Sequence, residues 1–225
     1  MVFVNHLIFI IDNADKYTNR YFTYICNMLS KAERTRNLIL EKSAPIFNQL
    51  GYGDTSLSTI CESTGLTKGA VYSNFKDKNE LALEAFNFIV RQSIFPLSDQ
   101  INSVRSPKVK LTVVFDYYRK YYKRTVELGG CPILNVGMDT THQNSELRKR
   151  VTQVINKLIL GVENIIIEGQ KEGEFMKSIT ANRYAKRIYS MIEGSIFTAI
   201  MQKDEAHIIE MMNYLDTMVQ SELYH

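Results

Sequence analysis

One segment, TSLSTICESTGLTKGAVYSNFKDK from Thr55 to Lys78, constrains the fold more than any other part of this chain. Its apolar residues recur three and four positions apart on both sides of Gly65, which is the spacing of helical faces. A glycine permits the sharp turn that joins two such helices. The pattern predicts a helix-turn-helix, with short helices from about Ser56 to Thr64 and from Thr67 to Phe75. The residues expected to form its core are Leu57, Ile60, Cys61, Leu66, Val71 and Phe75.

The outer surface of the second short helix carries small, basic or hydrogen-bonding side chains. Such side chains suit the part of a helix-turn-helix that enters the major groove of DNA. From Thr64 to Lys78 three lysines oppose a single acid, Asp77, although the whole chain has a net charge of only +3. This balance excludes a chain that coats polyanions generally and favours a local DNA-binding patch. The outer residues are Lys68, Gly69, Tyr72, Ser73 and Asn74.

Helix boundaries are recognisable along the rest of the chain. Ser30 and Glu33 form a capping box, and Pro107 suits a first helical position. Pro45 is expected to kink the first helix, and Pro96 to end the helix that follows Asp77. No run alternates with a strand period, so the sequence predicts an all-α protein. Helices are expected at 31–50, 56–64, 67–75, 78–94, 107–128, 131–139 and 145–172, with two more after Thr180 and Asp204.

These boundaries divide the chain into an N-terminal arm (1–29), a helix-turn-helix domain (30–76) and a larger helical domain (77–225). The arm shows no helical period, and Met28 stands two residues before Ser30. Two interpretations of the arm stay open. Translation starts naturally at Met28 and the upstream stretch is a gene-start artefact, or the arm is genuine.

Composition and motif content exclude several classes of protein. Hydrophobic residues make up 45% of the chain and charged residues 23%, as in an ordinary soluble globular protein. Three widely spaced cysteines argue against structural zinc and for a reducing cytoplasm. The apolar stretch 2–11 is too short to span a bilayer, so no membrane partner is expected. The four histidines are scattered, and no phosphate loop, HExxH or nucleophile elbow occurs. Neither an enzyme, a metal site nor a cofactor is therefore expected.

The stretch GLTKGAVYSNFKDKNEL closely resembles the signature of the TetR family of transcription regulators, and GYGDTSLSTICEST resembles the segment that precedes it in the family. The resemblance is strong from Lys31 to Phe88 and beyond that concerns only the order and length of the helices. Cys61, where the family often has alanine, and the long arm before Ser30 depart from it. The resemblance implies a three-helix DNA-binding domain joined through a fourth helix to a dimeric helical core.

Carried over position by position, the resemblance implies DNA contacts for a set of residues around the second short helix. Some would face base edges or the adjoining backbone, others would bind phosphates, Asn74 would do either, and Ser73 lies on the same surface. Lysine and hydroxyl groups are phosphate ligands, and Ala70 suits a thymine methyl. A plain surface role for Tyr72 and a neutral role for Gly69 are the alternatives. The residues facing bases or backbone are Lys68, Gly69 and Ala70, and the phosphate ligands are Thr55, Thr67, Tyr72 and Lys78.

The last two predicted helices carry apolar and small residues at spacings that suit antiparallel helix packing. We expect a homodimer interface there, a four-helix bundle from two protomers, with packing inside one chain as the alternative. A twofold dimer binds a palindromic operator, one half-site to each protomer. The expected interface residues are Tyr184, Ile188, Met191, Ser195 and Ala199 on one helix and Ile208, Met211, Leu215 and Met218 on the other.

The helix after Pro107 is rich in aromatic residues, whose polar tips would line a cavity for an amphipathic ligand; core packing is the alternative. By the family resemblance, a small-molecule inducer in this cavity would move the helix that begins at Lys78 and separate two reading heads. Cys131 is either a packing residue or, with a stabilised and accessible thiolate, a redox sensor. The predicted function is a ligand-released repressor, and the alternative is an architectural DNA-binding protein without an effector. The expected pocket residues are Phe115, Tyr118, Tyr122 and Cys131.

Overall fold

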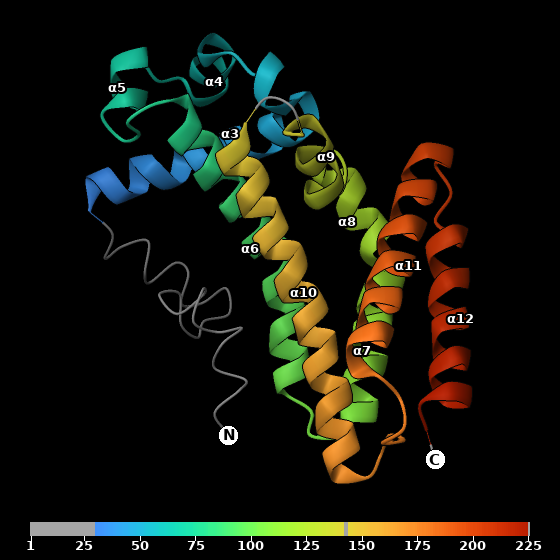
Figure 1. Cartoon of the computed structure of the whole chain (residues 1–225). Helices are drawn as coiled ribbons and strands as arrows, with labels where there is room; N and C mark the ends of the chain where they lie inside the picture. The colour runs from blue at the N-terminus through green and yellow to red at the C-terminus, as the bar shows by residue number, and fades with distance from the viewer. Residues whose placement is uncertain (1–29, 142–143, 225) are drawn as a thin grey trace.

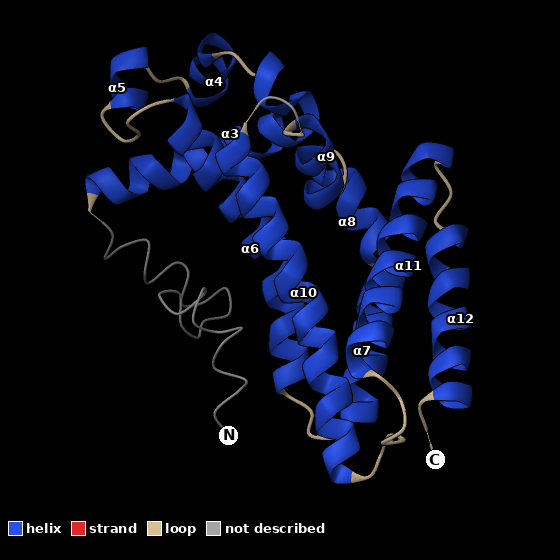
Figure 2. Cartoon of the chain, viewed as in Figure 1, coloured by secondary structure: helices blue, strands red, loops and turns tan. Residues whose placement is uncertain are grey.

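The computed structural model describes residues 30–141 and 144–224, and the interpretations of the arm at 1–29 lie outside this part of the chain. Over the described residues the chain is built from helices, which confirms the all-α prediction (Figure 1, Figure 2). None of these helices is long and apolar enough to cross a membrane. The helices are α3 (Lys31–Asp54), α4 (Leu57–Thr64), α5 (Lys68–Tyr72), α6 (Lys78–Asn102), α7 (Pro107–Arg119), α8 (Tyr121–Leu128), α9 (Pro132–Asp139), α10 (Ser145–Glu172), α11 (Ala181–Gln202) and α12 (Ala206–Glu222).

Helices α3, α4 and α5 lie together at one end of the molecule, and we call them the reading head (Figure 1). The Ser30 hydroxyl accepts the Glu33 amide at 3.2 Å, and the Glu33 carboxylate accepts the Ser30 amide at 2.7 Å, so the predicted capping box begins α3. Helix α3 contains Pro45, and its backbone leaves helical geometry at Gly51, where φ is 79°. The predicted core is confirmed: Ile60, Val71 and Phe75 are buried, and Leu57, Cys61 and Leu66 pack half-buried against them.

Helix α6 connects the reading head to the remaining helices, which we call the body (Figure 1). It begins after the predicted Asp77 cap and continues through Pro96 to Asn102. The prediction that Pro96 ends this helix is wrong. A proline removes one backbone hydrogen bond, and here buried side chains on both sides of it hold the helix together. The Tyr117 hydroxyl also donates to the Ser93 carbonyl, close to the missing bond.

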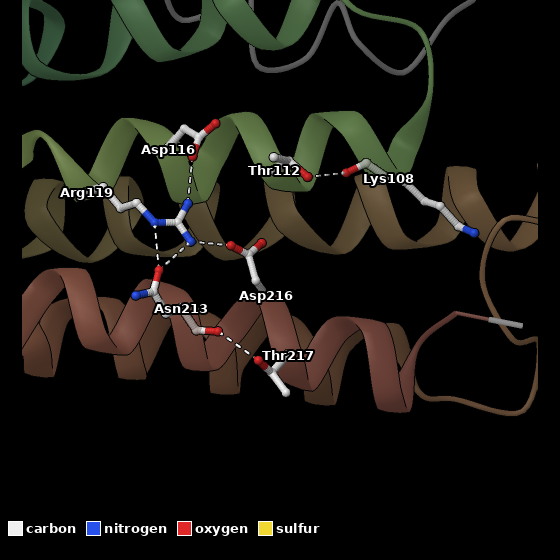
Figure 3. Close-up of polar contacts among 7 residues, drawn as sticks. All are labelled: Lys108, Thr112, Asp116, Arg119, Asn213, Asp216 and Thr217. Atoms are coloured by element: carbon white, nitrogen blue, oxygen red, sulfur yellow. Dashed lines mark hydrogen bonds and ion pairs between the residues drawn. The ribbon is translucent and has the colours of Figure 1, made fainter.

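The helix expected after Pro107 is divided into α7 and α8 at Lys120. Arg119, at the end of α7, fastens this helix to α12 (Figure 3). Its guanidinium donates to the side-chain oxygen of Asn213 at 3.1 and 3.2 Å and pairs with Asp216. It also pairs with Asp116 of its own helix at 2.6 Å. This polar clamp holds α12 against the body, where α12 also packs along α11.

The helices expected to form a dimer interface pack largely against their own chain. Helix α11 packs against α10 and α12, and α12 packs against α7. The small side chains of Ser195 and Ala199 allow this close approach within one chain. For the buried members of the set, the prediction of contact with a second protomer is therefore wrong. The buried residues are Ile188, Ser195, Ala199, Ile208, Leu215 and Met218, whereas Tyr184, Met191 and Met211 are half-buried.

Candidate DNA-binding site

Three local caps build the unit formed by α4, the turn and α5. The Ser56 hydroxyl accepts an amide of the first turn of α4 at 3.0 Å. Gly65 ends α4 in the left-handed region, with φ of 70°, and an αL glycine satisfies the last carbonyls of a helix. The Thr67 hydroxyl then accepts the Ala70 amide at 3.2 Å and begins α5. The predicted turn therefore places α5 on the outside of the reading head.

Helix α5 presents the predicted DNA ligands to solvent. Tyr72 is 47% exposed, which is far more than a core aromatic would be. A Cβ added at Gly69 would meet only the Thr67 hydroxyl, at 4.0 Å, so the fold itself leaves open space there. Open space beside a backbone permits the close approach of a DNA strand. Thr67, Lys68, Gly69, Tyr72 and Ser73 are exposed, and Ala70 and Asn74 are half-buried.

The side chains at the end of α5 are partly used by the helix itself. Ser73 Oγ and Asn74 Nδ2 both donate to the Ala70 carbonyl, each at 2.9 Å. Such bonds satisfy a carbonyl that the end of a short helix leaves without a partner. The Asn74 side-chain oxygen stays available as an acceptor, which suits the amino group on a base edge better than a phosphate.

Arg36 of α3 fixes the turn between α5 and α6, a role that the sequence analysis missed. Its guanidinium carbon lies 4.1 Å from the centroid of the Phe75 ring, and the same group donates to the Asn74 carbonyl and pairs with Glu80 at 3.2 Å. Glu80 also accepts the Lys76 amide at 2.8 Å, and this bond, together with Arg36, lowers the pKa of Glu80. No local spacing could reveal Arg36, because its partners lie far along the sequence.

Lys78 lies in the first turn of α6, beside Tyr52. Its Nζ is 4.5 Å from the centroid of the Tyr52 ring and donates to the Gly53 carbonyl at 3.3 Å. Partial burial lowers the pKa of this ammonium group. The position next to the N-terminus of α6 suits a phosphate, so the phosphate contact stays a prediction.

Thr55 does not have the role that was predicted for it. Its side chain is fully buried, and its hydroxyl donates to the Gly51 carbonyl at 2.6 Å. The prediction that this hydroxyl binds a phosphate is therefore wrong. The neighbouring Ser56 is exposed at the N-terminus of α4, where free amides and the helix dipole favour an anion. The signal for Ser56 was available, because a serine directly before an apolar helical run is a typical N-cap.

A polar junction joins the reading head to the body. Asn48 of α3 is buried, and its Nδ2 donates to the carbonyls of Leu128 and Gly130 at 2.7 and 3.0 Å. Asn135 of α9 donates in return to the Asn48 carbonyl at 2.9 Å. A shift of the connection between α8 and α9 must therefore move α3 or break these bonds.

A buried polar cluster surrounds Glu193 of α11. The Cys131 thiol donates to a carboxylate oxygen of Glu193 at 3.8 Å, and the Tyr189 hydroxyl lies near the same group. Burial raises the pKa of Glu193 to about 7, although both neighbours act in the opposite direction. Burial and the neighbouring Glu193 also raise the pKa of the Cys131 thiol. A buried thiol held in its neutral form does not meet the condition for a redox sensor, so Cys131 is a packing residue.

The expected pocket residues are distributed over two environments. Tyr118 and Cys131 belong to the Glu193 cluster. Phe115 is a fully buried core residue, and Tyr122 is half-buried against the core. A cavity of about 10 Å³ lies near the junction, which is room for one water molecule, and it is lined by residues other than these four. Within 30–141 and 144–224, no three His, Cys, Asp or Glu side chains gather as a metal site would require.

Two family profiles match the chain on either side of the boundary between head and body. The profile of bacterial regulatory proteins of the tetR family matches residues 39–85, and that of the tetracyclin repressor-like C-terminal domain matches residues 107–215. The chain belongs to the TetR family. TetR proteins are helix-turn-helix transcriptional regulators and not enzymes, and the geometry of α4 and α5 agrees with this.

Similar proteins bear out this assignment. A TetR transcriptional regulator from Chloroflexus aurantiacus superposes with a TM-score of 0.82 at 28% identity, covering 87% of this chain and 99% of that one. YxaF, an HTH-type transcriptional regulator of Bacillus subtilis, is 26% identical over 83% of this chain and 95% of its own length. The HTH-type regulator AcrR of Shigella flexneri is 43% identical over 54 residues, which cover 24% of this chain and 25% of that protein.

Proposed function

We propose that this TetR-family regulator is a ligand-released repressor that binds a palindromic operator as a homodimer. The observation that carries the proposal is the outer face of α5, where Lys68, Tyr72 and the capping Thr67 are exposed while Val71 of the same helix is buried. Side chains of this kind beside a helix N-terminus contact phosphates and position a recognition helix in the groove.

An apolar stripe on α11 and α12 supports the homodimer. Phe197 and Met201 lie four positions apart on α11 and are 56% and 66% exposed. Ile209 and Tyr214 of α12 are also exposed, and Gly194 leaves open space at the same face of α11. Large exposed apolar side chains gathered on two neighbouring helices are typical of an interaction site. Two copies joined through one stripe are related by a twofold axis, which matches a palindromic operator.

The connections between head and body support control by a ligand. Helix α6 carries Lys78 at its start and packs against helices of both parts. The Asn48 bonds reach Gly130, which directly precedes Cys131 of the buried cluster. A change of packing around Glu193 therefore has a short path to α3. A ligand lowers operator affinity only if it binds the DNA-free conformation more tightly than the DNA-bound one.

The test begins with selection of bound sequences from random duplex DNA, which should return inverted repeats. On the selected operator, Lys68→Ala should weaken binding by about tenfold and make it less salt-dependent. Lys177→Ala removes an exposed lysine of the body and is the matched control, with no expected effect. Equal affinity of the two variants, or selection of no common sequence, would remove the proposed role of α5.

An architectural DNA-binding protein without an effector is the second candidate. The complete burial of Phe115 and the small size of the cavity at the junction favour it. The two functions differ in one measurement, a screen for compounds that release the dimer from the selected operator. Release by a compound that leaves the dimer folded supports the repressor.

A further inference from the structure

We propose that the ligand recognised in the body is an organic cation whose ammonium group binds beside Glu193, between the rings of Tyr118 and Tyr189. The proposal deepens the ligand-released repressor and rests on it for the regulatory consequence. The cation site at Glu193 is inferred from the buried cluster alone.

Glu193 is a buried acid that lacks a cationic partner. The residue is 8% exposed, and its hydrogen-bond partner, the Cys131 thiol, is uncharged, as is the hydroxyl of the neighbouring Tyr189. Among the described residues, none of the ion pairs includes Glu193. An ionised carboxylate without a positive partner is strongly disfavoured in such surroundings, and burial accordingly raises its pKa.

Among the described residues of the body, the other buried charged side chain is Lys110, and it has a partner of opposite charge. Glu193 differs because it has none. Lys110 of α7 is 9% exposed, and its Nζ lies 2.7 Å from Glu168 of α10. This pair is complete within one chain. At Glu193 the corresponding positive group is missing, and a ligand that brings an ammonium group completes the pair.

The rings around Glu193 are suited to the same ligand. Tyr118 is buried close to the carboxyl, and its ring centroid lies 5.4 Å from that of Tyr121. The faces of tyrosine rings attract alkylammonium groups, and the attraction grows when the cation leaves water. Tyr189 is only half-buried, so its side chain is the one that moves to admit a ligand from the surface.

A cation at this site would act on the reading head through the junction. Cys131 touches Glu193 and follows Gly130, whose carbonyl is held by Asn48 of α3. An ammonium group that replaces the thiol as partner of Glu193 therefore displaces the start of α9. The α8–α9 connection and α3 move with it.

The experiment measures binding of benzyltrimethylammonium and hexyltrimethylammonium to the full dimer by titration calorimetry, with benzyl alcohol as neutral probe and phenylacetate as anionic probe. The wild type should bind an ammonium probe about tenfold or more tightly than either other probe. Glu193→Gln, which keeps the size and hydrogen bonding of the side chain, should lose this preference. Glu172→Gln, which removes an exposed acid of α10, should keep it. Circular dichroism and melting confirm that each variant is folded.

The outcomes separate this proposal from the proposed function. No preference for the ammonium probes in the wild type, or an unchanged preference in Glu193→Gln, overturns the cation site. If phenylacetate or benzyl alcohol instead releases the operator, the repressor stands and the cation site fails. If an ammonium probe binds through Glu193 without releasing the operator, the cation site stands and ligand-released repression fails.

Discussion

The reading head and the body place their functional side chains in opposite ways. In the head, the proposed DNA ligands are exposed on a helix that local caps hold in place, such as Ser56 and Thr67. In the body, Glu193 and Cys131 are buried and come from helices far apart in the sequence. Local sequence thus positions the side chains proposed to contact DNA, whereas long-range packing positions those of the Glu193 cluster.

The same contrast between buried and exposed positions divides α11 and α12. Leu215 is fully buried within the chain, whereas Phe197 is 56% exposed on the proposed dimer stripe. A charge at Leu215 has no partner in the core and should cost about 3–5 kcal/mol of the free energy of unfolding. A charge at Phe197 should leave each protomer folded and separate the dimer.

For the first prediction, Leu215→Glu and Phe197→Glu are compared by thermal melting and sedimentation equilibrium. Leu215→Glu should melt far earlier than the wild type or fail to fold. Phe197→Glu should sediment as a helical monomer, because association would bury an unpaired carboxylate in an apolar interface. A stable Phe197→Glu dimer would place the interface elsewhere on the protein.

The second prediction concerns pH and the cluster in the body. The carboxyl of Glu193 has an ordinary pKa of 4.5 in the unfolded chain and a pKa of about 7 in the fold. The folded state therefore binds the proton of Glu193 more tightly than the unfolded chain does. This proton contributes on the order of 3 kcal/mol to the free energy of unfolding below about pH 4.5. The contribution is lost as pH rises through 7. Glu193→Gln cannot ionise and should lack this decline.

Urea unfolding of both proteins at about pH 5 and about pH 8 measures the difference. The wild type should lose stability relative to Glu193→Gln between the two values. Glu172→Gln reports the effect of removing an exposed acid. Parallel behaviour of Glu193→Gln and the wild type would mean that the carboxyl reaches water in the folded protein.

The sequence predicted most of the fold and the core of the reading head, because both depend on local patterns. Caps and glycines give the boundaries of α4 and α10 closely, and the spacing around Gly65 identifies the helix-turn-helix. The sequence failed where a partner from elsewhere decides the outcome. Pro96 continues a helix because its flanks are packed, and an apolar seam on α11 does not reveal which side its own chain covers.

The roles of Arg36 and of the Glu193 cluster could not be predicted, because their partners are distant in the sequence. Arg36 is separated from its carbonyl partner by 38 positions, and Cys131 from Glu193 by 62. No spacing rule joins such residues, since the fold brings them together. Thr55 and Ser56 differ for another reason, because both have extended backbone, in which successive side chains point to opposite sides.

The third prediction tests the junction between head and body. Asn48→Ala removes two hydrogen bonds to backbone carbonyls and should lower the free energy of unfolding by about 1–3 kcal/mol. In the wild type, a releasing ligand should lower the affinity for the operator by about 5-fold to 150-fold. In Asn48→Ala the same ligand should lower this affinity by a smaller ratio. Asn182→Ala, which removes a bond to Glu163 in the body, should keep the ratio. An unchanged ratio in Asn48→Ala would assign the coupling to α6 alone.

The smallest effect separates two adjacent hydroxyls in the head. Thr55→Val removes the bond to the Gly51 carbonyl, and Ser56→Ala removes the cap of α4, so each should cost about 1 kcal/mol of stability. Only the Ser56 hydroxyl is exposed at a helix N-terminus, so Ser56→Ala alone should weaken operator binding, by a few-fold. Fluorescence anisotropy on the selected operator, below the melting range of both variants, measures the difference. Equal loss of affinity in the two variants would mean that destabilised packing of α4, and not a phosphate contact, limits DNA binding at this corner of the head.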